Sequence, residues 1–151
     1  MSHPYMNVWA SIAAYTNQQI AMIAANAIAS ADSMEMFDWE NHSNIEEAPA
    51  KHLIGPASLA IEEVSQGIYS ASFVIGIGSF NDEGLFVHRQ MVDSLFKSLG
   101  SGVRLSVFDY KTSQPYSWMK IIDGTAVAPM SKSGQRALQF IQAEALVDPM
   151  A

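Results

Sequence analysis

The sequence predicts an α+β fold in which two main helices pack as a single layer on a mostly antiparallel or mixed sheet. Three observations lead to this class. An Ala-rich stretch opens the chain, runs rich in β-branched and aromatic residues follow at hairpin distance, and one further amphipathic helix interrupts them. The 151 residues suit one hydrophobic core, so we predict a single domain over residues 1–151.

The first helix is predicted over residues 4–30. Pro4 suits the first turn of a helix, and Trp9, Ile12 and Ile20 recur at spacings that place them on one face. The Ala content of this stretch favours helix formation. Its charge-free part is interrupted by Asn and Gln and has no basic segment before it, so we expect neither a membrane span nor a signal peptide.

A short strand, a loop and a hairpin are predicted next. Residues 34–39 alternate Met with acidic side chains closely enough for a short strand. Residues 41–56 contain two prolines and little periodicity, which indicates a long loop that is extended or mobile. The runs 57–65 and 67–78 are close enough to form two antiparallel strands.

The second half of the chain is predicted to hold one helix and several strands. An apolar stripe runs through residues 82–99, and glycines end it. Alternation predicts a strand over 103–108, and 116–130 is predicted to be one long or bulged strand, broken near Gly124. The pattern of 135–147 permits either a helix or a strand.

The amino-acid composition excludes several classes of function. Hydrophobic residues make up 49% and charged residues 15% of the chain, against about 25% charged in an average soluble protein. The apolar surplus either fills the core or forms an outer patch that another protein covers. The net charge is −7, and residues 1–50 contain six carboxylates and no Lys or Arg, which argues against binding nucleic acid through its phosphates. Cysteine is absent, so disulfides and thiolate sites are excluded.

No pattern of an enzyme site is found, and we predict no catalytic activity, no cofactor and no metal. The four histidines lack the spacing that places two imidazoles on one metal. His42 and His52 share a predicted loop with Glu46 and Glu47, where a metal could be imagined, but a solvated acidic loop is the plainer interpretation.

The segment Gly76–Gly84 follows a strand and precedes a helix, as phosphate-binding turns do. Asn81 stands where a dinucleotide-binding turn needs its third glycine, and Asp82 with Glu83 would repel a phosphate. We therefore expect the glycines to relieve crowding under a packed helix, and a small-ligand site at this turn is the alternative.

Four residues are candidates for a protein interface. Arg89 and Asp93 are one turn apart on the second predicted helix and form either a local ion pair or an intersubunit salt bridge. Tyr116 and Trp118 begin a predicted strand and belong either to the core, the plainer interpretation, or to an interface anchor.

Four segments follow one another in a recognisable order: FVIGIGS, NDEGLFVHRQMVDSLFKSLGSGVRLSVFDY, IIDGTAVAPM and QRALQFIQAEALV. This order, over residues 73–147, resembles the tail terminator (tail completion) proteins of tailed bacteriophages, which pair a strand with a helix ending in glycine, then a short strand and Asp, and finish with a strand. The matching positions are Val92, Asp93, Leu95, Leu99, Gly102, Leu105, Asp109, Gly124 and the terminal segment.

The resemblance favours a strand over residues 135–147. It also implies a homo-oligomeric ring, expected to be a hexamer, that caps the tail tube and joins it to the neck or head connector. Such a ring would assemble in the host cytoplasm, reside in the virion and let DNA pass without specific binding. The alternatives are another head-tail joining or tail-tube-associated component, and the small-ligand domain described above.

Overall fold

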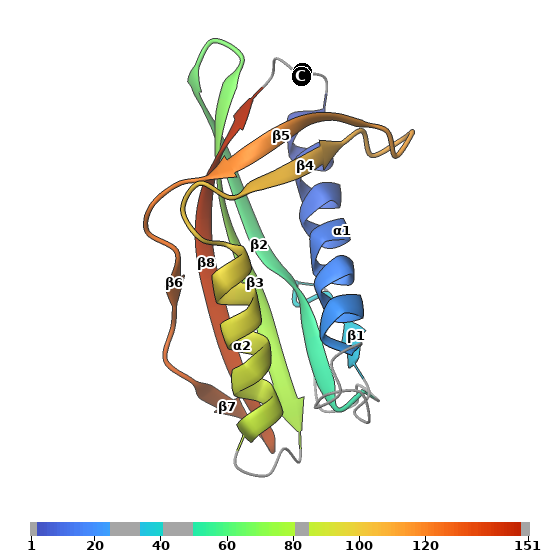
Figure 1. The fold of residues 1–151 in the computed structure, drawn as a ribbon, viewed down its shortest axis with the longest axis vertical. Coiled ribbons are helices and arrows are strands. Elements are labelled where there is room, and N and C mark those ends of the chain that lie inside the picture. The colour runs from blue at the N-terminus through green and yellow to red at the C-terminus, as the bar shows by residue number, and fades with distance from the viewer. Residues whose placement is uncertain (1–2, 25–33, 41–49, 81–84, 149–151) are drawn as a thin grey trace.

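The computed structural model describes residues 3–24, 34–40, 50–80 and 85–148. Two helices and a curled mixed sheet make up this part of the chain (Figure 1). Strands follow the order β1-β2-β3-β8-β5-β4, and β6 and β7 also pair with β8. The elements are α1 (Pro4–Ala24), β1 (Met34–Met36), β2 (His52–Ser65), β3 (Ile68–Phe80), α2 (Phe86–Ser98), β4 (Arg104–Phe108), β5 (Pro115–Ile121), β6 (Ala126–Val127), β7 (Ser131–Ser133) and β8 (Arg136–Asp148).

The α+β class and the mostly antiparallel sheet are confirmed. The one parallel contact in the described sheet joins β1 to the start of β2. The terminal segment 135–147 is a strand, and β8 lies centrally, between β3 and β5. Within the described residues no helix is both long and apolar enough to cross a membrane.

The predicted loop 41–56 is wrong at its C-terminal end, because residues 52–56 open β2. All five are buried, so they lack the alternation that marks a half-exposed strand. Pro56 lies at a register shift between β2 and β3, where a residue without an N–H is tolerated. Residues 41–49 lie outside the described part of the chain.

The helix boundaries also differ from the prediction. α1 is described to Ala24, and the predicted residues 25–30 lie outside the described part. α2 begins at Phe86, after Leu85 in a left-handed conformation with φ 56°. The predicted break near Gly124 is confirmed, since this residue has φ +106° and separates β5 from β6.

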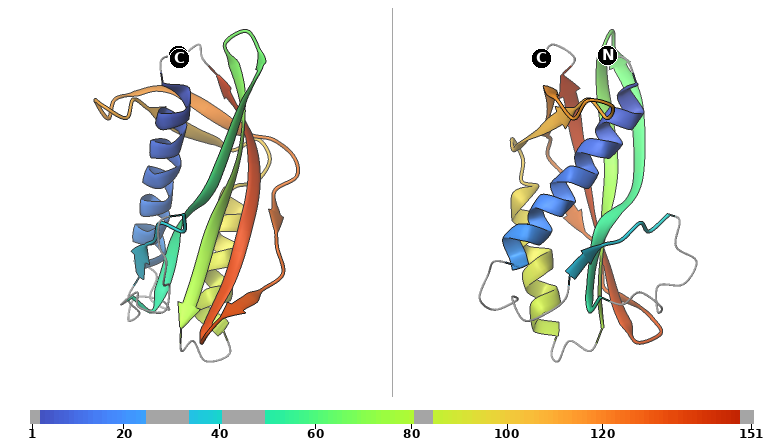
Figure 2. Two further views of the ribbon diagram at one scale, coloured as in Figure 1. Left: turned by 180° about the vertical axis from the view of Figure 1, so that it is seen from behind. Right: turned by 90° about the vertical axis from the view of Figure 1, so that its right-hand side faces the viewer.

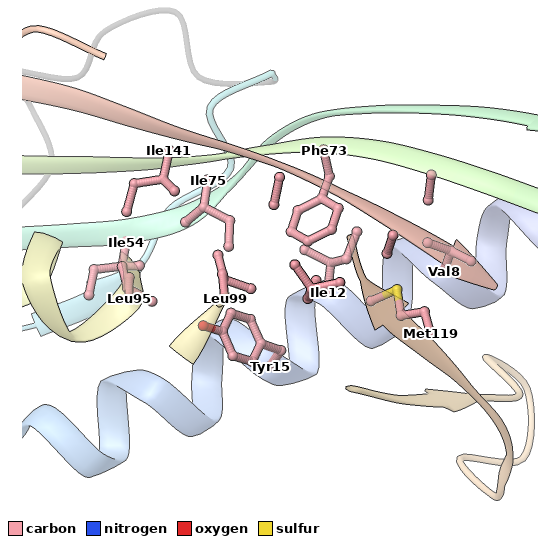
Figure 3. Packing of buried hydrophobic residues seen from close by; sticks show 14 of the residues in the cluster. Val8, Ile12, Tyr15, Ile54, Phe73, Ile75, Leu95, Leu99, Met119 and Ile141 are labelled. Atoms are coloured by element: carbon pink, nitrogen blue, oxygen red, sulfur yellow. The ribbon is translucent and has the colours of Figure 1, made fainter. Parts of the chain in front are cut away.

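The main core lies between the sheet and both helices (Figure 3). α1 contacts β2 and β4, whereas α2 contacts β3, β6 and β8. Val8 and Ile12 of α1 and Leu95 and Leu99 of α2 belong to one cluster with β3. Figure 2 shows how the sheet curls around this core. Burying the large apolar side chains stabilises the fold by roughly 1.5–3 kcal/mol each.

Gly76 and Gly78 are covered by Trp39, which corrects the expectation of a packed helix. A Cβ on Gly76 would lie 2.7 Å from the Trp39 indole, whose N–H donates to the Gly76 carbonyl oxygen at 3.1 Å. Alternation explains the difference: Ile75 and Ile77 face the helices, so the glycines face the opposite side of β3.

A candidate self-assembly surface

Register aligns five residues across the outer face of the sheet. Arg104 of β4 pairs with Lys120 of β5, Lys120 with Leu146 of β8, Leu146 with Ser70 of β3, and Ser70 with Glu62 of β2. We call these five residues the outer row. It begins with two positive charges on β4 and β5 and ends with a negative charge on β2.

The outer row faces away from the helices. Its sequence neighbours Met119, Val147 and Ala71 are all fully buried in the main core, and side chains alternate between the two faces of a strand. The left view of Figure 2, from behind, shows β3 and β8 in front of α2. Leu146 is 41% exposed within this surface.

Trp118 lies on the same face and not in the core, which corrects the plainer interpretation of the sequence. Its side chain is 46% exposed, because the next residue, Met119, takes the buried position on β5. The Arg104 guanidinium carbon lies 4.0 Å from the Trp118 ring centroid. Such stacking is worth about 0.5–1 kcal/mol at an exposed site. It holds an aromatic ring and a cation together at the surface, a combination enriched at the centres of protein interfaces.

Besides the edges of the short strands β1, β6 and β7, two strand edges lack a strand partner among the described residues. β4 pairs with β5 on one side only, and β2 pairs with β1 over His52–Ile54 only. One end of the β4 edge is covered, because the Phe108 N–H donates to the Ser11 hydroxyl of α1 at 2.9 Å. The rest of each edge is the kind of surface onto which another chain can add a strand.

The projecting end of the β2–β3 hairpin carries both charge and apolar surface. Glu62 and Glu63 are exposed, and so are Val64 and Ile68 at the turn. Figure 1 shows this hairpin standing out beyond β5. An apolar tip flanked by carboxylates is complementary to a partner surface that is basic and partly aromatic.

The structure does not bring the four predicted interface residues together. Arg89 and Asp93 lie on α2, on the core side of the sheet, whereas Trp118 lies on the outer face. The ion pair on this part of α2 joins the Asp93 carboxylate to the Lys97 ammonium at 3.2 Å. Both side chains are well exposed, so this i,i+4 pair contributes only about 0.3–0.5 kcal/mol. Tyr116 shares β5 with Trp118.

A buried polar chain, which the sequence did not reveal, links β2, β3, α2 and β8. Ser79 Oγ lies 2.9 Å from His52 Nδ1 and 2.8 Å from His88 Nδ1, and His88 Nε2 lies 3.1 Å from Gln139 Oε1. Gln139 donates its amide N–H to the Ala128 carbonyl oxygen. Its Oε1 therefore accepts a hydrogen bond from the Nε2–H of His88. In a neutral His88 the other ring nitrogen, Nδ1, then accepts from the Ser79 hydroxyl. The Ser79 oxygen in turn accepts from the Nδ1–H of His52.

This arrangement has the residue types of a nucleophile and a base, but their side chains are not accessible from the solvent. Both histidines are fully buried and Ser79 is 2% exposed, so no substrate reaches the hydroxyl. The chain of hydrogen bonds instead fixes α2 against the sheet. The loop predicted to be solvated and acidic does not hold His52, which begins β2; His42, Glu46 and Glu47 lie outside the described residues. The described part of the chain contains no group of three or more His, Asp or Glu side chains that could hold a metal.

No family model and no curated protein sequence matches this chain. Several solved structures do match. One of them, whose name describes no function, superposes with a TM-score of 0.52 at 11% identity over 90% of this chain and 92% of its own. Structural similarity at this level of sequence identity shows that another protein has a similar fold.

Proposed function

We propose that this chain is a structural assembly protein that forms a closed homo-oligomeric ring, and that the ring is the tail terminator of a tailed bacteriophage. In this proposal six copies cap the tail tube and join it to the neck or head connector. The two helices form the predicted single layer over one face of the sheet. The chain carries no catalytic site.

The observation that carries self-assembly is the presence of two open strand edges, β4 and the distal part of β2, toward opposite ends of one sheet. Ring formation needs a head-to-tail interface, in which two different surfaces of each subunit meet. A sheet with one free edge toward each end supplies two such surfaces. Exposed Trp118 and Leu146 add apolar contact area beside them.

The phage assignment is supported by the sequence resemblance over residues 73–147. β3, α2, β4 and β8 occupy that stretch in the order of the family's pattern, with Asp109 directly after β4. The net charge of −7 fits a ring through which DNA passes without specific binding, since carboxylates repel phosphates weakly. The ring would assemble in the host cytoplasm and remain in the virion.

Size-exclusion chromatography with light scattering tests the assembly, and negative-stain images of the same fraction test the ring. The proposal expects a mass of several subunits and ring-shaped particles, either alone or after addition of purified tail tubes. A monomer at high concentration that leaves tail tubes uncapped would refute it. Binding to a head connector but not to tubes would instead favour another head-tail joining component.

Thermal unfolding with nucleotides tests the small-ligand alternative, because a ligand that binds the folded state raises its melting temperature. Trp39 already fills the space over Gly76 and Gly78. A ligand site at the Gly76–Gly84 turn would therefore depend on residues 81–84, which lie outside the described part. A clear shift with a nucleotide would favour that alternative.

A further inference from the structure

We infer that the ring interface pairs the basic end of the outer row on one copy with the acidic end of the outer row on the next copy. The basic end is Arg104 and Lys120, and the acidic end is Glu62, whereas its exposed neighbour Glu63 pairs with Tyr69 and therefore lies on the opposite face of β2. The occupant of each end is thus a second copy of this chain. The inference rests on the proposed self-assembly and deepens it by naming the contact.

The charges of the outer row do not take part in ion pairs within the described part of the subunit. Arg104, Lys120 and Glu62 are exposed. The ion pair found among the described residues joins Asp93 and Lys97, and Arg104 stacks on Trp118 without a carboxylate partner there. Opposite charges on one face that are not paired with each other are complementary to the same face of a second copy.

Each charged end also belongs to an open strand edge. Arg104 begins β4, and Glu62 and Glu63 lie in the distal part of β2 that β1 does not cover. Adding β4 of one copy to β2 of the next would satisfy backbone N–H and C=O groups along both edges. The Phe108 end of β4 is tied to Ser11, so the shared ladder would use residues 104–107 and extend over about 14 Å.

The charges also disfavour symmetric contacts between like edges. Pairing β4 with β4 of another copy would place two basic ends in one interface, and pairing β2 with β2 would place two acidic ends there. Each of these symmetric contacts closes a dimer and stops growth. Like charges within one interface repel each other, so the charge pattern disfavours the dimers and favours the head-to-tail contact from which a ring closes.

Trp118 restricts the conformation of the basic end. Its indole ring packs against the Arg104 guanidinium, with 4.0 Å between the guanidinium carbon and the ring centroid, which limits the conformational freedom of the cation before binding. At the acidic end, Val64 and Ile68 of the hairpin tip are exposed; Val64 is two residues after Glu62, and Ile68 begins β3 across the turn. Each charged end therefore carries apolar surface that would be buried in the same contact.

Charge reversal at the two ends, in the full chain, tests the inference. One variant carries Arg104→Glu with Lys120→Glu, and the other carries Glu62→Lys. Each alone should assemble at a concentration at least about tenfold higher than the wild type, which corresponds to about 1.4 kcal/mol. A mixture of the two, or one chain with all three substitutions, should recover assembly because every contact is again complementary. Light scattering over a concentration series provides the readout.

The matched control is Lys111→Glu with Lys132→Glu, which changes net charge equally at two exposed positions away from the outer row. It should assemble like the wild type. The neutral pair Arg104→Gln with Lys120→Gln should give an intermediate loss, and circular dichroism confirms that each variant is folded. Assembly of the wild type should also weaken between 0.05 and about 0.5 M salt, since salt screens exposed charges.

The outcomes separate the two proposals. If the wild type forms rings and the reversed variants assemble equally well, this pairing is wrong while the proposed function stands. A loss in either variant that the mixture does not recover also overturns the pairing. If the wild type forms no oligomer alone or on tail tubes, the proposed function and this inference both fail.

Discussion

Tyr15 should make the folded state sensitive to alkali in a way that can be calculated. Its side chain is buried between α1 and α2 (Figure 3), and its hydroxyl forms a hydrogen bond with the Ser98 hydroxyl. Burial raises the pKa of Tyr15 to about 12 from its ordinary 10, and the hydrogen bond with Ser98 opposes this only in part. The folded state therefore holds its proton more tightly than the unfolded state.

The direction in which pH changes the stability follows from that difference in pKa between the folded and unfolded states. Stability due to the neutral phenol is complete below pH 10 and is lost as pH rises from 10 to 12, because the unfolded chain ionises first. The loss is about 1 kcal/mol at pH 11 and about 2–3 kcal/mol in all. Tyr15→Phe cannot ionise, so it should lack this loss, at a cost near neutral pH of about 1 kcal/mol for the hydrogen bond.

Urea unfolding followed by fluorescence at several pH values between 8 and 11.5 measures this difference. The free energy of unfolding of the wild type should fall more steeply above pH 10 than that of Tyr15→Phe. Tyr5→Phe removes a hydroxyl from an exposed tyrosine and should follow the wild-type curve. Parallel curves for the wild type and Tyr15→Phe would refute the placement of the Tyr15 hydroxyl in the core.

Three substitutions and one control, Gly100→Ala, test the packing that positions the sheet, each by urea unfolding. Gly55→Ala should cost about 1–3 kcal/mol or more, because its Cβ would lie 1.9 Å from the Phe37 carbonyl oxygen, whereas Gly100→Ala, 3.4 Å from its nearest neighbour, should change stability by less than about 1 kcal/mol. Ser79→Ala should cost about 1–3 kcal/mol by removing the hydroxyl between the two buried imidazoles; a change below about 0.5 kcal/mol would contradict the hydrogen-bond chain. Arg136→Met should cost about 2–3 kcal/mol and speed amide exchange at the start of β2, because the guanidinium donates to the Lys51 and Ala50 carbonyl oxygens at 3.1 and 2.8 Å. Unchanged exchange there would argue against that tether.

The elements that alternate or carry a clear apolar stripe could be predicted from the sequence. Residues 103–108 and the hairpin strands follow a period of two, and α2 has its buried residues on one side. The start of β2 could not be found in this way, since residues 52–56 are buried throughout and include a glycine and a proline. Local pattern is weakest where a strand is covered on both faces.

The candidate surface needed information that local pattern does not contain. Alternation divides β5 into one set with Trp118 and Lys120 and another with Met119 and Ile121. The charge of Lys120 is the signal that could have placed Trp118 on the exposed face. The outer row itself depends on the strand order β3-β8-β5-β4, which is not sequential, so residues from positions 62 to 146 meet only in the folded sheet.

Native mass spectrometry of the wild-type chain over a concentration series tests the central claim most directly. A head-to-tail contact between two different edges predicts a monomer and one closed oligomer of several copies, with few species between them. A distribution that stops at the dimer would mean that a symmetric contact had formed instead. A monomer at every concentration, on and off tail tubes, would contradict the account.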